Sequence, residues 1–150
     1  MSASNAVSVT PWGGKGGSQP WEFILPDGAR LIGISVRSGV VLDSISFTYK
    51  NQEGTQTTRP FGGTGGAPYE TETFSNDEFV IGISGRVGSL NDLTVITSLS
   101  IQTNVITYGP YGTNPGVDFS IGVNEGKFLG FYGRCGAYID SLGVILQPKI

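Results

Sequence analysis

The chain has 150 residues, with 9 basic and 12 acidic side chains, a net charge of -3 at pH 7, 24 glycines and no histidine. This length suits one domain that buries its own core, and we predict a single domain over residues 1–150. The absence of a basic cluster argues against nucleic acid as a partner. With no histidine and Cys135 as the lone cysteine, the chain cannot form an intrachain disulfide, a Cys/His zinc site or a His-based catalytic dyad.

The N-terminal segment MSASNAVSVTPWGG has neither the basic start nor the apolar core of a signal peptide. No later apolar run approaches the length of a membrane span. We therefore expect a cytoplasmic protein, or one shared between cytoplasm and nucleus, with no membrane insertion.

Short runs rich in Val, Ile, Thr and aromatic residues alternate with Gly and Pro turns along the whole chain. No stretch of about 12 residues shows the apolar period of a helix, so the predicted fold class is all-β. The aromatic side chains of the strands are expected to pack in the core rather than to bind a ligand: Trp12, Trp21, Phe61, Tyr69, Phe119 and Phe131.

Three segments superimpose without a gap and share the pattern G-x3-R-x-G-x3-D. They read DGARLIGISVRSGVVLDS at 27–44, NDEFVIGISGRVGSLNDL at 76–93 and NEGKFLGFYGRCGAYIDS at 124–141. Each begins with a turn signal, continues into an apolar strand, turns at the second glycine and leaves through another strand. A hairpin repeated about every 50 residues predicts three equivalent units in one fold.

Glycine-rich segments lie between these hairpins: WGGKGG at 12–17, FGGTGG at 61–66 and the looser YGPYGTNPG at 108–116. The first precedes every hairpin and none follows the last, as expected of a closed ring of three units that is cut open once. Closure around a pseudo-threefold axis would place the first loop beside Asp140, as the second lies beside Asp43. It would also cover apolar faces and strand edges that an open sheet exposes.

A glycine loop opposite an aspartate suits the binding of a sugar. Glycines let bare backbone N–H groups approach a ligand, and a carboxylate accepts hydrogen bonds from vicinal hydroxyls. Tyr138 is placed to cover the C–H face of a sugar ring. The alternative is an ordinary turn whose Asp binds local backbone, which repetition alone does not exclude. The repeated arginines could pair with the Asp of their own loop, but we expect them to remain solvated: Arg37, Arg86 and Arg134.

The chain resembles the jacalin-related lectins over essentially its whole length. Four segments in this order carry the resemblance: WGGKGG, FGGTGG, YGPYG and GRCGAYIDSLGVIL. The resemblance implies a type I β-prism of three four-stranded Greek-key sheets that binds mannose or galactose. It implies no catalysis, no metal and no cofactor, and assembly into homodimers or homotetramers.

The resemblance also implies two sugar sites, in which the Asp carboxylate accepts hydrogen bonds from the sugar 4- and 6-hydroxyls. The residues that match the first site are Gly17, Gly136, Ala137, Tyr138 and Asp140. Those that match the second, present in some mannose-binding members, are Gly39, Val40, Val41, Asp43 and Gly66. Val40 stands where an acidic residue can occur, which lowers the affinity expected of the second site.

The middle hairpin keeps Gly88 and Asp92 as a third candidate site. Its partner loop, however, has Pro110 and Pro115 in place of glycine pairs. Its exit strand is also one residue out of apolar phase with the corresponding strand of the first hairpin. We therefore expect the third site to be degenerate.

The sugar is predicted from the first glycine loop. The resemblance implies that the polypeptide of galactose-binding members is cleaved in this region. The glycine N-terminus freed by the cut has a new amino group, which helps to bind the axial 4-hydroxyl of galactose. Here WGGKGGSQPWEF is intact, so the expected partners are glycans that contain mannose or glucose. The alternatives are a galactose-preferring lectin, a structural module that contacts protein through a sheet face, and a glycosidase. A glycosidase would need a second carboxylate within roughly 10 Å of Asp140.

Overall fold

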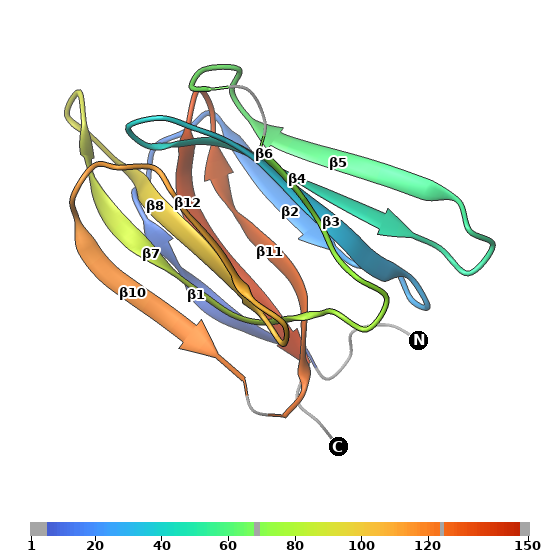
Figure 1. The fold of residues 1–150 in the computed structure, drawn as a ribbon. Helices are drawn as coiled ribbons and strands as arrows, with labels where there is room; N and C mark the ends of the chain where they lie inside the picture. Colours follow the sequence, from blue (N-terminus) through green and yellow to red (C-terminus); the bar gives the residue numbers. More distant parts are fainter. Residues whose placement is uncertain (1–5, 68–69, 124, 148–150) are drawn as a thin grey trace.

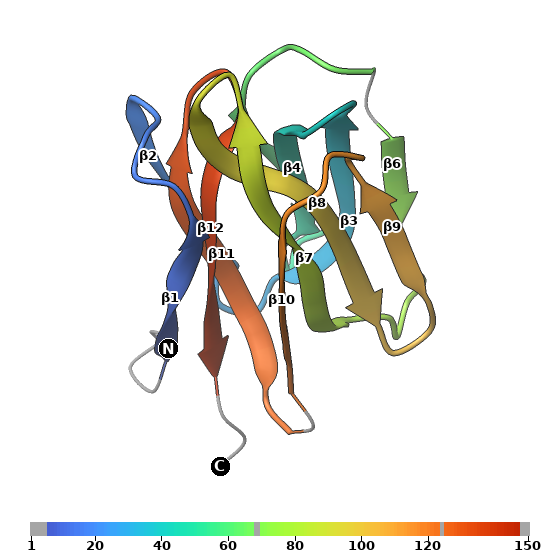
Figure 2. The ribbon, with the colours of Figure 1, turned by 90° about the vertical axis from the view of Figure 1, so that its left-hand side faces the viewer.

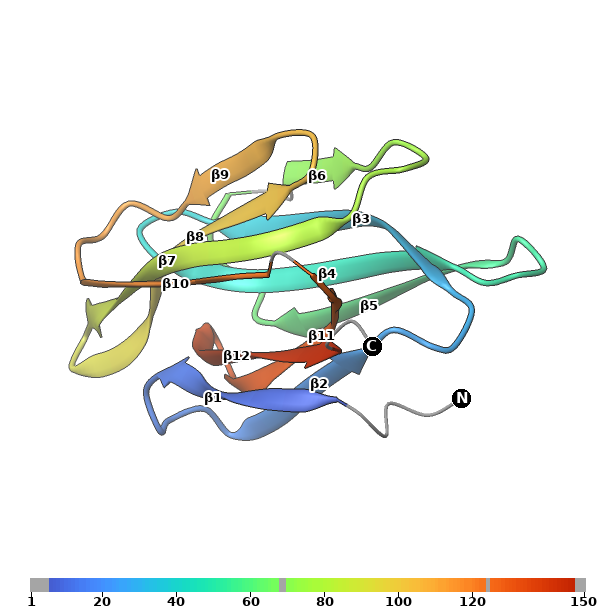
Figure 3. The same ribbon diagram turned by 90° about the horizontal axis from the view of Figure 1, so that it is seen from below.

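The computed structural model describes residues 6–67, 70–123 and 125–147, and its regular elements in these ranges are all β-strands. The strands are β1 (Val7–Gly13), β2 (Gln19–Ile24), β3 (Arg30–Ser38), β4 (Leu42–Lys50), β5 (Gln56–Gly62), β6 (Glu70–Thr73), β7 (Val80–Leu90), β8 (Leu93–Thr103), β9 (Thr107–Tyr111), β10 (Val117–Gly122), β11 (Lys127–Cys135) and β12 (Ile139–Gln147). They form three four-stranded sheets around a common interior (Figures 1 and 3). The described residues contain no helix long and apolar enough to cross a membrane. The predicted all-β prism is confirmed.

Each sheet has one of the repeated hairpins at its centre and one further strand on either side. The strand orders are β1-β12-β11-β2 in the first sheet, β5-β4-β3-β6 in the second and β10-β7-β8-β9 in the third. All neighbouring strands are antiparallel. The three segments that superimpose in the sequence are thus equivalent elements of the fold.

The first sheet joins strands from the two ends of the chain. β1 pairs with β12, from Val7 opposite Leu146 to Gly13 opposite Ser141, and β2 pairs with β11. In Figure 2 the blue β1 lies beside the red β12. This pairing is the ring closure that the order of the glycine loops predicts, and it brings the 13–17 loop next to Asp140.

Aromatic side chains from different sheets stack in the interior. Phe47 of β4 lies 4.6 Å from Phe23 and 5.0 Å from Phe131 between ring centroids, with interplanar angles of 5° and 11°. Trp12 and Phe119 stack at 4.7 Å and join the first sheet to the third. The predicted core aromatics lie in or against this core, whereas Tyr69 is outside the described residues.

The hairpin of the third sheet is longer than the other two. β7 and β8 have 11 residues each, whereas β3, β4, β11 and β12 have nine. Its turn residues Asn91 and Asp92 have φ of 50° and 65°, the left-handed conformations of a two-residue type I′ turn. The gapless superposition of the middle repeat is therefore wrong beyond Gly88, because this hairpin continues where the others turn.

The hairpin turns and the glycine loops collect at one end of the prism. In Figure 2 the β1–β2, β3–β4, β7–β8 and β11–β12 connections all lie at the upper end. The segment that follows β5, which contains the 62–66 loop, also lies there. Segments far apart in the sequence thus meet at this end, where a ligand would contact several of them together.

Candidate functional site

The first site consists of Asp140 and the glycine loop after β1. Asp140, the second residue of β12, is only 3% exposed. A Cβ atom on Gly17 would lie 2.8 Å from Asp140 Oδ1, and one on Gly16 would lie 3.3 Å from Oδ2. Gly17 has φ of +85°, a conformation that L side chains rarely adopt. Only glycines let the loop approach the carboxylate this closely.

The β11–β12 turn forms the other side of the first site. The N–H of Gly136 donates to the carbonyl of Tyr138 at 3.0 Å, which closes a tight turn. Ala137 at its tip is exposed, whereas Gly136 and Tyr138 are half-buried. The loop and the turn therefore bring together all five residues expected in this site.

The second site repeats this arrangement in the second sheet. Asp43 is 5% exposed, and Cβ atoms on Gly65 and Gly66 would lie 2.9 Å from its Oδ2 and 2.5 Å from its Oδ1. Gly66 has φ of +74°. The N–H of Gly39 donates to the carbonyl of Val41 at 3.1 Å and closes the corresponding turn. The two sites thus share the same backbone design.

The second site differs from the first in its side chains. Val40, at the tip of the turn, is 50% exposed, whereas Val41 is 1% exposed. Val41 can therefore offer a ligand little beyond its backbone. The half-buried Tyr138 at the corresponding place gives the first site an aromatic surface that the second site lacks.

Burial changes the acidity of both aspartates in the same way. Desolvation raises the pKa of Asp140 and of Asp43 above the usual range of a carboxyl group. The neighbouring arginine, Arg134 or Arg37, partly opposes this rise by stabilising the carboxylate. Each site therefore presents a buried carboxylate with few competing water contacts, whose charged form is favoured by the neighbouring arginine.

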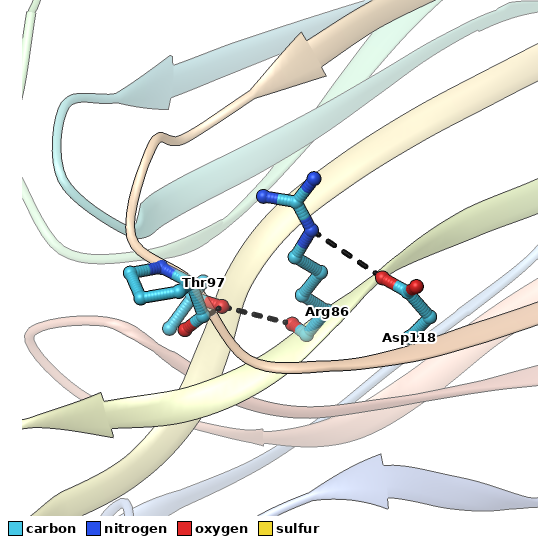
Figure 4. A network of polar contacts seen from close by, with 4 residues as sticks. Arg86, Thr97 and Asp118 are labelled. Carbon is cyan, nitrogen blue, oxygen red and sulfur yellow. Dashed lines mark hydrogen bonds and ion pairs between the residues drawn. The ribbon is translucent and has the colours of Figure 1, made fainter.

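Two of the repeated arginines are not simply solvated, contrary to the expectation from the sequence. Arg134 donates hydrogen bonds to the carbonyls of Gly16 and Gly17, and Arg37 donates to those of Gly65 and Gly66. Arg86 in the third sheet pairs instead with Asp118 at 3.3 Å (Figure 4). The G-x3-R-x-G frame shows that an arginine recurs, but it does not show that this side chain reaches the glycine loop.

The third sheet does not form an equivalent site, because Asp92 does not occupy the place of Asp43 and Asp140. Cross-strand pairing matches Arg86 with Ser98, just as Arg37 pairs with Ser44 and Arg134 with Ser141. The residue before Ser98 is Thr97, which is fully buried. Its hydroxyl lies within hydrogen-bond distance of the carbonyl oxygen of Arg86 (Figure 4) and of that of Pro115. A threonine already bonded to backbone takes the place of the carboxylate.

Asp92 lies instead beside the first site. The tip of the long β7–β8 hairpin and the 13–16 loop line an open cavity of about 450 Å³. The cavity is lined by Gly13, Gly14, Lys15, Gly16, Asp92, Leu93, Thr94 and Asp140. The alignment of the three repeats did not associate Lys15, Leu93 and Thr94 with the first site, because it assigned the middle hairpin to a separate site.

Each glycine-rich loop also contacts the hairpin of a neighbouring sheet. A Cβ atom on Gly63 would overlap the carbonyl oxygen of Ala137, in the turn of the first site. A Cβ atom on Gly14 would overlap the carbonyl oxygen of Thr94, and the N–H of Asn114 donates to the carbonyl of Val40 at 2.8 Å. The 62–66 loop of the second site is thereby supported by the turn of the first.

Known proteins match this chain over almost all of its length. A model of the jacalin-like lectin domain matches residues 9–145. Horcolin from Hordeum vulgare is 36% identical over 148 residues, which cover 97% of this chain and 99% of horcolin. Wild-type Malaysian banana lectin has a TM-score of 0.87 and 38% identity over 96% of this chain and 99% of its own. AcmJRL, a mannose-binding jacalin-related lectin from Ananas comosus, has a TM-score of 0.85 and 34% identity over 97% of this chain and 99% of its own.

The three-sheet fold, together with the matching family model, identifies a carbohydrate-binding protein. The chain belongs to the jacalin-like lectin family. Members of this family bind carbohydrates without catalysis, so the glycosidase alternative is set aside. The described residues also contain no group of three or more His, Cys, Asp or Glu side chains that could hold a metal ion.

Proposed function

We propose that this lectin binds mannose or glucose units of glycans at two sites per chain, one at Asp140 and one at Asp43. The observation that carries the proposal is the repeated geometry of the two sites. In both, a buried carboxylate lies against two successive glycines of a loop, the second of which has a positive φ. A hairpin turn closed by one backbone hydrogen bond lies next to them. The Val40 tip makes the second site the weaker of the two.

The chemistry of the first site suits a pyranose with neighbouring hydroxyls. The Asp140 carboxylate accepts hydrogen bonds from two sugar hydroxyls, and such charge-assisted bonds are stronger than neutral ones. The N–H groups of Gly17, Ala137 and Tyr138 donate to ring and hydroxyl oxygens. The ring of Tyr138 covers a C–H face of the sugar. In the second site, Asp43 and the N–H groups of Gly66, Val40 and Val41 have the corresponding roles.

Mannose or glucose is favoured over galactose by two observations. The first glycine loop is continuous with β1 and β2, so it carries no new amino group for an axial 4-hydroxyl. AcmJRL, which matches this chain over nearly its whole length, is described as mannose binding. A galactose preference is the alternative that a direct comparison of the two sugars would reveal.

We expect titration calorimetry with methyl α-mannoside to give two binding events per chain, each weak because a monosaccharide buries few atoms. Methyl α-galactoside should give far less heat under the same conditions. A preference for the galactoside would contradict the proposed specificity, and no heat with either sugar would contradict the proposed function.

Oligomeric assembly would increase the binding strength of this lectin. We propose that the chain, a single domain over residues 1–150, forms homodimers or homotetramers, which would convert weak sites into strong glycan binding through avidity. Sedimentation velocity would test the assembly, and microscopy of the tagged protein would test the cytoplasmic or nucleocytoplasmic location. Both stay predictions.

The contact between Gly63 and Ala137 predicts that one substitution weakens both sites. A methyl group in Gly63→Ala must displace either the 62–66 loop or the 136–138 turn, and such overpacking costs about 1–3 kcal/mol. We expect lower affinity at both sites, measured as site-resolved NMR titrations of the Gly17 and Gly66 amides. Gly122→Ala is the control, since its Cβ would meet only the Ile81 carbonyl oxygen at 3.4 Å. Normal affinity at the first site would show that the two loops are independent.

A further inference from the structure

In both complete sites, the arginine of the repeat reaches the carbonyl groups of the glycine loop. Arg134 Nε lies 3.2 Å from the carbonyl oxygen of Gly16 and 3.2 Å from that of Gly17, and its Nη2 lies 2.8 Å from the latter. Arg37 Nε lies 3.0 Å from the carbonyl oxygen of Gly65, and its Nη2 lies 3.5 Å from that of Gly66. One guanidinium therefore holds two successive carbonyls in each loop.

The planar peptide group links each held carbonyl to an N–H that faces the opposite way. In a trans peptide the C=O of one residue and the N–H of the next are fixed in one plane and point in opposite directions. The Gly16–Gly17 and Gly65–Gly66 peptides are trans. Holding the Gly16 carbonyl thus fixes the direction of the Gly17 N–H, and holding the Gly65 carbonyl fixes that of the Gly66 N–H.

These two N–H groups are the loop donors of the proposed sugar sites. Glycine loops have many accessible conformations, and ordering them on binding would cost affinity. We propose that Arg134 and Arg37 are positioning residues, which hold the glycine-loop carbonyls so that the Gly17 and Gly66 N–H groups already face the sugar. This inference rests on the proposed sugar binding at these two sites.

The same arginines also act on the carboxylates. Asp140 and Asp43 each lie beside the Cα atoms of two loop glycines, where a Cβ atom would stand. The arginine of the same repeat binds the carbonyls of these glycines. Burial raises the pKa of each carboxyl, and the arginine partly opposes this rise. One side chain therefore both orders the loop donors and favours the charged acceptor opposite them.

The third sheet provides an internal comparison. There Thr97 replaces the aspartate, and the 108–116 segment has prolines in place of glycine pairs. Arg86, from the same position of the repeat, pairs with Asp118, which is 87% exposed (Figure 4). The contact with loop carbonyls thus occurs in the two sheets that have a complete site, and Arg86 is a matched control.

The test uses single-site proteins, with Asp43→Asn to isolate the first site and Asp140→Asn to isolate the second. Arg134→Lys keeps the charge but loses the planar fork that spans two carbonyls, whereas Arg134→Gln loses both. We expect each to lower the affinity of the first site for methyl α-mannoside about tenfold, the scale of one charged hydrogen bond. Arg37→Lys should do the same at the second site, and Arg86→Lys should change neither.

Two readouts separate positioning from a general structural role. The pH at which half of the sugar affinity is lost should rise in Arg134→Gln and not in Arg134→Lys, because only the former removes the charge beside Asp140. In sugar-free protein, the Gly17 amide hydrogen should exchange faster with solvent in both variants, with the thermal midpoint of unfolding unchanged.

An unchanged exchange rate of the Gly17 amide in both variants would overturn the inference even if the wild type binds no sugar. Unchanged affinity in both variants, or an equal loss in Arg86→Lys, would also overturn it.

Discussion

Replacing both Asp43 and Asp140 by Asn is expected to abolish sugar binding while leaving the thermal midpoint at or above that of the wild type. Each carboxylate is the charged acceptor of its site, and a hydrogen bond to a charged group contributes about 1.5–3 kcal/mol. Losing two such bonds per site lowers affinity by about 100-fold or more. For weak monosaccharide binding, such a loss leaves no measurable heat.

The stability of this double variant follows from the sign of the pKa shifts. Burial raises the pKa of both carboxyls in the folded state, so the folded protein takes up protons more readily than the unfolded chain. Ionised Asp43 and Asp140 therefore lower stability at neutral pH, and this cost disappears as the pH falls through the raised pKa. Neutral Asn avoids the cost. Sugar binding should also weaken on acidification at a pH above the usual carboxyl range, because it needs the charged form.

Asp118→Asn is the control for this experiment. Its side chain is 87% exposed and pairs with Arg86 in the third sheet, not with a glycine loop. It should keep both binding events and the wild-type midpoint. A double variant that still gives two binding events would refute the assignment of the sites, and one that loses binding through a large drop in midpoint would refute the stability argument.

Phe47→Ala is expected to cause the largest loss of stability from a single substitution. Phe47 is completely buried and stacks on Phe23 and Phe131 of the first sheet, so it joins two of the three sheets. Removing a buried phenylalanine side chain leaves a cavity and costs about 3–5 kcal/mol. The free energy of unfolding from a urea titration would measure the loss.

Phe79→Ala is the matched control, since this phenylalanine is 53% exposed. Exposed substitutions usually change stability by about 0.5 kcal/mol or less. If Phe47→Ala unfolded with the same free energy as Phe79→Ala, the interior would not depend on the aromatic stack between the sheets.

The hairpins could be predicted because they depend on residues close together in the sequence, and the closed ring because the order of the repeated segments indicates it. Turn residues bound each strand, and the glycine loops mark where one unit ends and the next begins. The displaced first loop implied a closed ring with that loop beside Asp140, and the pairing of β1 with β12, which includes Val7 opposite Leu146, confirms the closure. The residues of the first two candidate sites came from the family resemblance, and the equal length of their two hairpins places them at corresponding positions.

The position of Asp92 could not be predicted from the repeated frame, because a hairpin can lengthen without changing its first residues. The apolar phase of the exit strand contained the signal. ITSL at 96–99, and not the segment beginning at Asp92, matches LDSI at 42–45 and IDSL at 139–142. The type I′ turn at Asn91 and Asp92 accommodates the additional residues, and it carries Asp92 to the cavity beside the first site.

The arginine contacts were beyond sequence reasoning for a different reason. A long, flexible side chain on a strand can point to solvent or to any neighbour, and surface pairs contribute little to stability. Its partners here are backbone carbonyls more than 100 residues away for Arg134, a contact that only the ring closure creates. Geometry of this kind leaves no pattern of residue types in the sequence.

The most direct measurement is an NMR titration of the ¹⁵N-labelled wild-type protein with methyl α-mannoside. We expect the amides of Gly17 and Gly66 both to shift and saturate, the Gly66 amide at higher sugar concentration, while that of Thr97 stays unchanged. Saturating shifts elsewhere on the prism, with both loop amides unmoved, would contradict this prediction.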